Sequence, residues 1–247
     1  MLVSEVMLQQ TQVSRVLGAY PRFLRRFPGP AALARAPLGD VLRSWSGLGY
    51  NRRARDLWRA ARAASGALPR TREALDALPG VGRYTAGAVA CFAYDAPEAF
   101  AETNIRRVLG RLVLGRPATI AVAEAIDMEL LPRRRAARWH HALMDLGATV
   151  CLARAPRCDR CPLARACVAN LRGTATIAAA PRRQAAFATS DRRVRGAILR
   201  ALAPTRDGLT IAALRGAFDD ARIPRIAAEL VAEGLVERSG RRLRLPA

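Results

Sequence analysis

The 247-residue chain has no lysine: every one of its 41 basic residues is arginine. An enzyme that opens a sugar through a Schiff base needs an amine that can lose its proton, and a guanidinium cannot serve. The only other amine is the N-terminal amino group of Met1. The absence of lysine therefore excludes lysine-dependent Schiff-base chemistry.

Acidic residues are scarce as well. The chain has 20 Asp and Glu residues and 41 arginines, which gives a formal net charge of +21 and a pI of about 11.6. This balance predicts a polyanionic partner, with nucleic acid as the leading candidate. The alternative is that a GC-rich genome has enriched alanine and arginine without selection for binding.

Long apolar runs are missing too. No segment approaches the ~18 consecutive apolar residues of a membrane span, and no N-terminal run has the pattern of an export signal. We therefore expect no membrane partner. The cysteines indicate a reducing cytoplasm, and we expect a bacterial protein associated with the nucleoid.

Cysteine is rare but clustered. Four of the five cysteines follow the spacing C-x6-C-x2-C-x5-C, at Cys151, Cys158, Cys161 and Cys167. Four thiolates brought together by short loops can hold a metal, and this spacing favours a [4Fe-4S] cluster. A structural zinc is the alternative, although zinc quartets usually come as two close pairs separated by a longer insert. Disulfides are disfavoured, because the fifth cysteine, Cys91, lies in an apolar helical run typical of a core.

The first 170 residues show helical periodicity with short connections, and almost nothing alternates with the period of a strand. We therefore expect an all-α domain over residues 1–170. One helix is expected over residues 2–18, with an apolar stripe of Val3, Val6, Met7, Val13, Val16 and Leu17 and a polar stripe of Glu5, Gln9 and Gln12. Further helices are expected at 30–44, 52–65, 71–77, 84–93, 103–113, 121–130 and 135–150.

The end of the chain indicates a second domain. Residues 171–190 are rich in small residues, lack periodicity and are expected to be a linker. In residues 191–247, Asp191 and Thr210 are expected to cap two helices, and a third helix is expected from Ile223 to Glu233, ending at Gly234. Two short strands about Ser239 and Gly240 follow as a hairpin. This order predicts a small winged-helix-like module.

The motif LPGVGRYT at residues 78–85 lies between two expected helices. Gly80 and Gly82 let backbone amides converge at the start of the second helix, where the helix dipole also favours an anion. A plain helix–helix turn would use the same glycines, but Leu-Pro before them and Arg83 after them favour a clamp for the DNA backbone. Tyr84 and Thr85 complete this turn.

LPGVGRYTAGAV, the cysteine quartet, SEVMLQQT at residues 4–11, GLGY at 47–50 and MDLGATVC ending at Cys151 together resemble the adenine DNA glycosylase (MutY) branch of the helix-hairpin-helix DNA glycosylase superfamily, which includes endonuclease III. The resemblance covers residues 1 to about 170. It implies a helix-hairpin-helix fold with a [4Fe-4S] loop at residues 151–167. It also implies a monomeric enzyme that binds double-stranded DNA with a mismatch or damaged base, flips out adenine opposite 8-oxoguanine or guanine, and cuts the glycosidic bond.

The resemblance assigns two carboxylates to the chemistry. Glu5 matches the acid that protonates the departing adenine and then helps a water attack the sugar. The residues around Glu5 support this role. A carboxylate among Val3, Val6 and Met7 is poorly solvated and therefore stays able to donate a proton. The place expected to hold the family's catalytic aspartate holds Glu102, which keeps the charge but adds one methylene. The alternative is that Glu102 is a helix-capping acid with no catalytic part.

The remaining assignments concern water and DNA. The resemblance implies that Asn104 positions water or Glu5, that Gln10 and Thr11 contact the base opposite adenine, and that Tyr50 wedges into the stack there. Tyr84 stands where lyase members carry lysine, so the implied activity is base removal without strand cleavage.

Two departures from the family pattern keep other functions open. The C-terminal unit is too short for the Nudix-like domain that typical members use to recognise 8-oxoguanine. Glu5 also lies close to Met1, so the start of the chain is expected upstream or the helix is expected to fray. The alternatives are a glycosylase for thymine or uracil opposite guanine, and a DNA-binding protein whose catalysis is impaired by Glu102.

Overall fold

The computed structural model describes residues 1–176 and 186–247, and they form two compact units. The cysteine-loop unit consists of Met1, Arg70–Asp76 and Gly82–Arg182. The terminal unit consists of Leu2–Pro69, Ala77–Val81 and Arg183–Ala247. Within the described residues, no helix is long and apolar enough to cross a membrane.

The cysteine-loop unit is helical. Its α-helices are α6 (Arg72–Asp76), α7 (Arg83–Tyr94), α8 (Thr103–Leu109), α9 (Ile120–Leu130), α10 (Ala136–Thr149) and α11 (Val168–Leu171). A π-helical turn at Gly110–Leu114 extends α8, and single 3-10 turns lie at Arg133–Arg135 and Cys158–Arg160. The buried side chains of Phe100, Ile105 and Leu109 anchor its core, which also contains Cys91 as expected.

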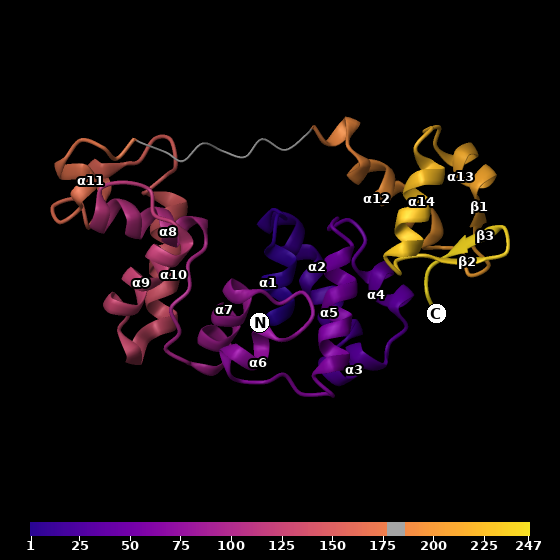
Figure 1. Ribbon diagram of the computed structural model, residues 1–247, viewed down its shortest axis with the longest axis horizontal. Coiled ribbons are helices and arrows are strands. Elements are labelled where there is room, and N and C mark those ends of the chain that lie inside the picture. Colours follow the sequence, from indigo (N-terminus) through magenta and orange to yellow (C-terminus); the bar gives the residue numbers. More distant parts are fainter. Residues whose placement is uncertain (177–185) are drawn as a thin grey trace. The chain divides into compact units, whose positions relative to one another are not determined.

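Helix α8 lies directly against α10 in this unit (Figure 1). Gly147 makes the close approach possible, because a Cβ added at Gly147 would lie only 2.6 Å from Cβ of Asn104. Gly147 therefore allows α10 to pack closely against the N-terminal half of α8.

The terminal unit begins with five helices: α1 (Leu2–Leu8), α2 (Val13–Arg26), α3 (Pro30–Arg35), α4 (Leu38–Ser44) and α5 (Arg52–Ala63). Phe23 and Trp45 are fully buried at its centre, with their rings edge to face at 5.9 Å. Aromatic pairs of this geometry add to the burial of their area.

The C-terminal module, residues 191–247, belongs to the terminal unit. After a 3-10 turn at Phe187–Thr189 come α12 (Asp191–Leu202), β1 (Leu209–Thr210), α13 (Ile211–Ala217), α14 (Ile223–Ala232), β2 (Glu237–Ser239) and β3 (Arg242–Arg244). The strands form an antiparallel sheet in the order β1-β3-β2. Figure 1 shows the three helices gathered around this sheet. The three helices and the hairpin that the sequence predicts are therefore present.

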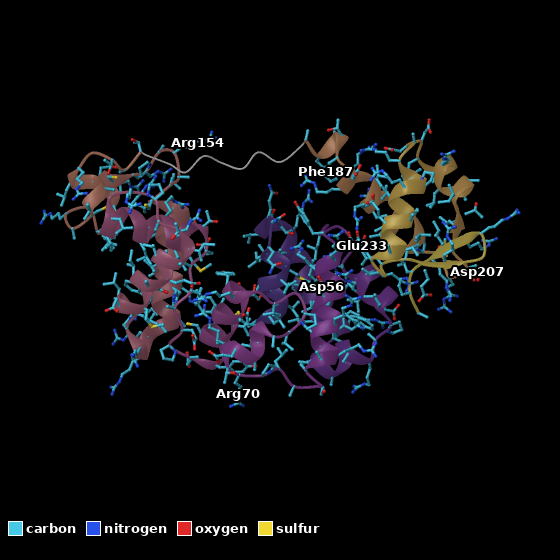
Figure 2. The ribbon with its side chains drawn as sticks, viewed as in Figure 1. Asp56, Arg70, Arg154, Phe187, Asp207 and Glu233 are labelled. Carbon is cyan, nitrogen blue, oxygen red and sulfur yellow. The ribbon has the colours of Figure 1, made fainter. Side chains whose placement is uncertain are left out.

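The C-terminal module is fastened to α4 and α5. The backbone N–H of Gly39 donates to the carbonyl of Pro246 at 2.9 Å, and Nε of Arg43 donates to the carbonyl of Ala203 at 2.8 Å. A Cβ at Gly39 would lie 2.4 Å from the Pro246 oxygen, so only glycine allows this contact. Glu233, labelled in Figure 2, forms ion pairs with Arg52 of α5 and with Arg195 of α12.

Most helix predictions are confirmed with small shifts at the ends, as for α5, α6, α7, α9 and α10. The predicted cap at Thr210 is present, because its hydroxyl accepts the N–H of Ala213 at 3.1 Å. Gly234 follows α14 in the left-handed region, with φ of 69°, as a helix end requires. The linker predicted at 171–190 falls partly on residues 177–185, which lie outside the described residues.

Four local predictions are wrong. The helix expected over 2–18 is broken, because Gln10 adopts a φ of 54° between α1 and α2. Val13 and Leu17 are consequently 60% and 70% exposed instead of in the core. The helix expected over 30–44 breaks before Pro37, since proline disfavours the helical conformation of the preceding residue, and Ala36 is extended.

The other two errors concern single turns. The helix expected over 103–113 changes to a π-turn after Leu109. Asp191 does not cap α12 with its side chain; it is the first residue of the helix and pairs with Arg222 and Arg225.

Candidate functional site

Glu102 is the N-cap residue of α8. Its Oε1 accepts the backbone N–H of Asn104 at 2.6 Å and that of Ile105 at 2.9 Å. These amides have no partner within the helix, so the carboxylate satisfies them and also complements the helix dipole. Its second oxygen, Oε2, has no hydrogen-bond partner among residues 1–176 and 186–247. The arrangement holds one carboxylate oxygen fixed and leaves the other available.

Asn104 is held in place by Arg107. The guanidinium donates through Nη2 to Oδ1 of Asn104 at 2.6 Å and to the carbonyl of Gly147 at 2.7 Å, and through Nε to the carbonyl of Cys151 at 2.7 Å. Burial lowers the pKa of the Arg107 guanidinium below its ordinary value. One side chain therefore joins the start of α8 to the end of α10 and to the first cysteine.

Arg111 binds the same loop one helical turn later. It is 2% exposed, and it donates to Sγ of Cys151 at 3.4 Å and to the carbonyls of Leu152 and Ala153 at 2.7 and 2.8 Å. Its Nε is buried and has no hydrogen-bond partner among the residues that the structure describes. A buried guanidinium with an unsatisfied donor indicates that an anionic group belongs beside it.

The four late cysteines line one small cavity together with Arg111. Burial, together with the neighbouring cysteines, raises the pKa of the Cys158 thiol above its ordinary value. Within the described ranges, no group of His, Cys, Asp and Glu is arranged to hold a single metal ion. Four cysteine side chains that line one cavity are a donor set that a cubane cluster can use, because such a cluster binds each thiolate through a separate iron.

The two glycines of the LPGVGRYT turn have different environments. Gly80 has a φ of 75°, and a Cβ there would lie 2.5 Å from Cβ of Asp56, so this position requires glycine. Gly82 precedes α7 as its N-cap residue, and a Cβ there would meet nothing within 4 Å. The start of α7 thus carries no side-chain cap and has open space where an anion can approach.

The residues that follow Gly82 lie in the first turn of α7. Nε of Arg83 donates to Glu124 at 2.8 Å, while the Arg83 side chain stays 69% exposed. The ring of Tyr84 packs edge to face on Phe100 at 5.6 Å. Thr85 is 2% exposed, so a DNA contact from this residue would come through its backbone and not its hydroxyl.

Glu5 lies on α1 and is half-buried. Val6 and Met7 beside it are buried, as the apolar stripe predicts, and Leu2 is buried as well. The Glu5 carboxylate therefore lies at an apolar surface of helix α1.

Gln10, Thr11 and Tyr50 occupy two adjacent turns. Gln10 and Tyr50 both have left-handed backbones, with φ of 54° and 47°, which non-glycine residues rarely adopt. The hydroxyl of Thr11 donates to the carbonyl of Leu48 at 3.3 Å and so joins the two turns. The structure thus brings together the three residues assigned to the base opposite adenine.

Arg53 holds both turns in this position, and no motif in the sequence marks this role. Its guanidinium donates to the carbonyls of Val6 and Met7 at 2.8 and 3.1 Å and to Oγ1 of Thr11 at 2.9 Å. It also lies over the ring of Tyr50, with 5.2 Å to the centroid. Burial lowers the pKa of Arg53 to about 10. The strained backbones of Gln10 and Tyr50 are therefore maintained by one half-buried cation, the Arg53 guanidinium.

The family follows from comparison with known proteins. A model described as the HhH-GPD superfamily of base excision DNA repair proteins matches residues 3–133. This chain belongs to that superfamily.

Curated relatives within the superfamily are adenine DNA glycosylases. The protein of Mycobacterium tuberculosis (strain ATCC 25618 / H37Rv) is 44% identical over 96% of this chain and 82% of its own length. That of Mycolicibacterium smegmatis is 42% identical over 96% and 84%, and that of Rattus norvegicus is 41% identical over 72% and 37%. The assignment to the adenine DNA glycosylase branch is confirmed.

Solved structures show the same fold. Endonuclease III trapped covalently on DNA in an estranged-adenine complex matches with a TM-score of 0.62 and 27% identity, over 70% of this chain and 84% of that one. A thermostable thymine-DNA glycosylase matches with a TM-score of 0.60 and 28% identity, over 69% and 83%. The predicted all-α helix-hairpin-helix glycosylase fold is confirmed.

This HhH-GPD protein also contains a buried network around Asp127 that sequence reasoning missed. Asp127 accepts Nε1–H of Trp139 at 2.7 Å and the backbone N–H of Phe100 at 3.1 Å, and it lies 2.7 Å from Nε2 of His140. Both Asp127 and His140 are 0% exposed. The network ties α9, α10 and the segment before α8 together, and its only sequence signal was the Trp139–His140 pair.

The predicted site residues of this HhH-GPD protein are divided between the units. Glu5, Gln10, Thr11, Tyr50 and Gly80 belong to the terminal unit. The cysteine-loop unit holds Gly82, Arg83, Tyr84, Thr85, Glu102, Asn104 and the four late cysteines. Arg154 (Figure 2), Arg157 and Arg160 lie on the cysteine loop and are exposed.

Proposed function

We propose that this protein removes adenine from DNA where it is mispaired with 8-oxoguanine or guanine, as a monofunctional glycosylase of base excision repair. The similarity to curated adenine DNA glycosylases over 96% of the chain is the observation that carries this proposal. The excess of arginine supports a DNA ligand, because neutralised phosphates release their counterions.

Glu5 acts as the general acid. The N-glycosidic bond breaks more easily when the departing adenine is protonated, and a carboxyl group on the apolar surface of α1 remains able to donate. After the bond has broken, the carboxylate of Glu5 accepts a proton from the water that attacks the sugar. Protons and electrons balance over the two steps. Adenine leaves with the bonding electron pair and the proton from Glu5, and the sugar gains hydroxide from the water.

Glu102 stabilises the sugar cation. Cleavage passes through an oxocarbenium-like state, and a fixed anion lowers its energy. The cap bonds to Asn104 and Ile105 hold Oε1, so the positive charge faces Oε2. Asn104, held by Arg107, orients the water.

The proposed reaction ends at the abasic site. A lyase step requires a deprotonated amine to form a Schiff base, and the chain has no lysine. Tyr84, packed on Phe100, forms part of the wall of the base pocket.

The proposed cofactor is a [4Fe-4S] cluster on Cys151, Cys158, Cys161 and Cys167. The unsatisfied Nε of Arg111 and the mutual closeness of the thiols support it. When bound, the cluster supplies a fixed, anionic anchor for the loop that Arg107 and Arg111 grip. We expect about four iron atoms per chain, against one zinc for the alternative.

The function is tested with four duplexes in single turnover, in which A lies opposite 8-oxoguanine, A opposite G, T opposite G or U opposite G. The released base is identified by chromatography, and each strand is analysed with and without hot alkali. We expect free adenine from the first two duplexes and strand breaks only after alkali. Release of thymine or uracil alone would establish the alternative specificity, and tight binding without release would establish a protein that only binds DNA.

A further inference from the structure

A large basic groove lies between α12 and the turn at Gly47–Arg53, inside the terminal unit. It has a volume of about 860 Å³. Gln10, Thr11 and Tyr50 line it together with residues of α12. Of the described residues that line this α12 groove, seven are arginines and none is Asp or Glu. The groove therefore presents positive charge beside the residues assigned to the base opposite adenine.

The arginines of the groove fall into two groups. Arg52 and Arg195 pair with Glu233, and Arg193 pairs with Asp220 at 2.8 Å, so their charges are partly balanced. Arg15 and Arg200 are exposed, and neither side chain has an acidic partner within residues 1–176 and 186–247. Two cations at the rim of the groove are thus available to a ligand.

Arg192 connects the module to the wedge residue. Its Nη1 donates to the hydroxyl of Tyr50 at 2.8 Å, and its guanidinium lies 5.9 Å from the centroid of the Tyr50 ring. Arg53 lies over the same ring, at 5.2 Å. The module therefore helps to fix where the Tyr50 ring lies in the groove.

At Gly196, the backbone of α12 forms an uncovered part of the groove wall. Gly196 lies in the middle of α12, where glycine costs about 1 kcal/mol relative to alanine. A Cβ at this position would meet nothing within 4 Å, and the backbone needs no left-handed conformation. No contact with the described part of the chain explains the glycine, whereas the close approach of a ligand backbone does.

The other helices of the module are poorly suited to DNA. In a helix-turn-helix, the second helix normally enters the major groove with free polar and basic side chains. Helix α14 carries one arginine, Arg225, which pairs with Asp191 and Glu229. Basic residues of the module that face a groove are instead concentrated on α12.

We propose that the α12 groove binds the sugar–phosphate backbone of the DNA strand that carries the base opposite adenine. Arg200 and Arg15 neutralise phosphates at the rim, Gly196 lets the backbone approach α12, and Arg192 holds Tyr50 beside the opposite base. The choice of strand rests on the proposed function, whereas the DNA-binding role of the groove does not.

The first test places a carboxylate in the groove. Gly196→Glu puts a negative charge on the open face of α12, while Gly216→Glu makes the same change on exposed α13, where a Cβ also meets nothing within 4 Å. Affinity for a fully paired duplex is measured by fluorescence anisotropy, which does not depend on excision. We expect Gly196→Glu to weaken binding about tenfold or more at low salt, and Gly216→Glu less than about twofold. Equal effects of the two variants would overturn the proposal.

The second test counts phosphates. Arg200→Gln should reduce the slope of log affinity against log salt by about 0.9, the value for one neutralised phosphate. Arg215→Gln, which removes an exposed arginine of α13, should leave the slope unchanged. An unchanged slope in Arg200→Gln would contradict a phosphate contact.

The strand is identified with neutral methylphosphonates placed on one strand at a time around an A opposite 8-oxoguanine. Substitutions in the strand opposite adenine should weaken binding by the wild type, and the one at the phosphate that Arg200 neutralises should have no further effect on Arg200→Gln. If only the adenine-containing strand responds, the strand assignment is wrong. If the wild type releases no adenine but the Gly196→Glu and Arg200→Gln effects persist, the proposed function fails while the groove remains a DNA site.

Discussion

The Glu102 side chain accepts the backbone N–H of Asn104 at 2.6 Å and thereby caps the helix that carries Asn104. A glutamate reaches these amides by folding its longer side chain back on the helix, whereas the residues preferred at this position are shorter. Capping is compatible with the proposed catalytic role, because the cap uses Oε1 and leaves Oε2 available.

The first prediction concerns the length of the Glu102 side chain. Aspartate is a preferred capping residue, so Glu102→Asp should keep α8 intact and move the carboxylate by one methylene. We expect single-turnover adenine release to rise by up to ~100-fold, since that is the usual cost of a 1 Å misplacement. Glu102→Gln, which keeps an acceptor oxygen but loses the charge, should lower the rate by about 100-fold or more. An equal or slower rate in Glu102→Asp would show that the extra methylene is not limiting.

Arg53 should be essential for the two turns that hold Gln10 and Tyr50. Arg53→Met removes a charged donor from several carbonyl oxygens and from Thr11, and we expect it to cost about 3 kcal/mol in urea denaturation. Arg59→Met changes an exposed arginine on the same helix and should cost less than about 0.5 kcal/mol. Similar losses in both variants would refute the role given to Arg53.

Acid should weaken the attachment of the C-terminal module. Hydrogen bonding from Arg52, together with Arg195, lowers the pKa of Glu233 from 4.5 to about 2. A carboxyl group with a lowered pKa stabilises the folded state above its unfolded pKa, and this contribution disappears as the pH falls through the folded pKa. The stability difference between wild type and Glu233→Gln should thus be constant above pH 4.5 and vanish as the pH falls to about 2. A difference that does not change over this window contradicts the ion-pair account.

Two neighbouring glycines should respond differently to alanine. Gly80→Ala places a methyl group 2.5 Å from Cβ of Asp56 in a left-handed backbone, and should lower the free energy of unfolding by about 2 kcal/mol or more. Gly82→Ala meets open space, so its stability should change little while its affinity for DNA falls. Thermal denaturation and anisotropy measure the two effects, and loss of stability in Gly82→Ala would exclude a free anion site.

The sequence predicted the features that depend on local pattern. Apolar periodicity located α5, α7, α9 and α10, and the hydroxyl of Thr210 signalled the start of α13. The alternation of turn and strand residues located the hairpin around Gly240, which has a φ of 58°. Each of these signals involves residues that are close together in the sequence, so the sequence alone is enough to predict the element.

Features that depend on distant partners could not be read from the sequence. The break at Gln10 has no proline or glycine to mark it, and it is stabilised by Arg53, which is 43 positions further along the chain. The same holds for Arg107, which joins Asn104 to Cys151, and for Arg192, which reaches Tyr50. With 41 arginines in the chain, composition alone does not distinguish those that build the site from those that are solvated.

The most direct test of the central claim is single-turnover adenine release from a duplex with A opposite 8-oxoguanine, measured for the wild type and for Glu5→Gln. The account predicts free adenine from the wild type. It predicts no detectable release from Glu5→Gln, which should bind the same duplex with wild-type affinity, because the amide cannot protonate the leaving base. Failure of the wild type to release adenine, or release by Glu5→Gln at the wild-type rate, would contradict it.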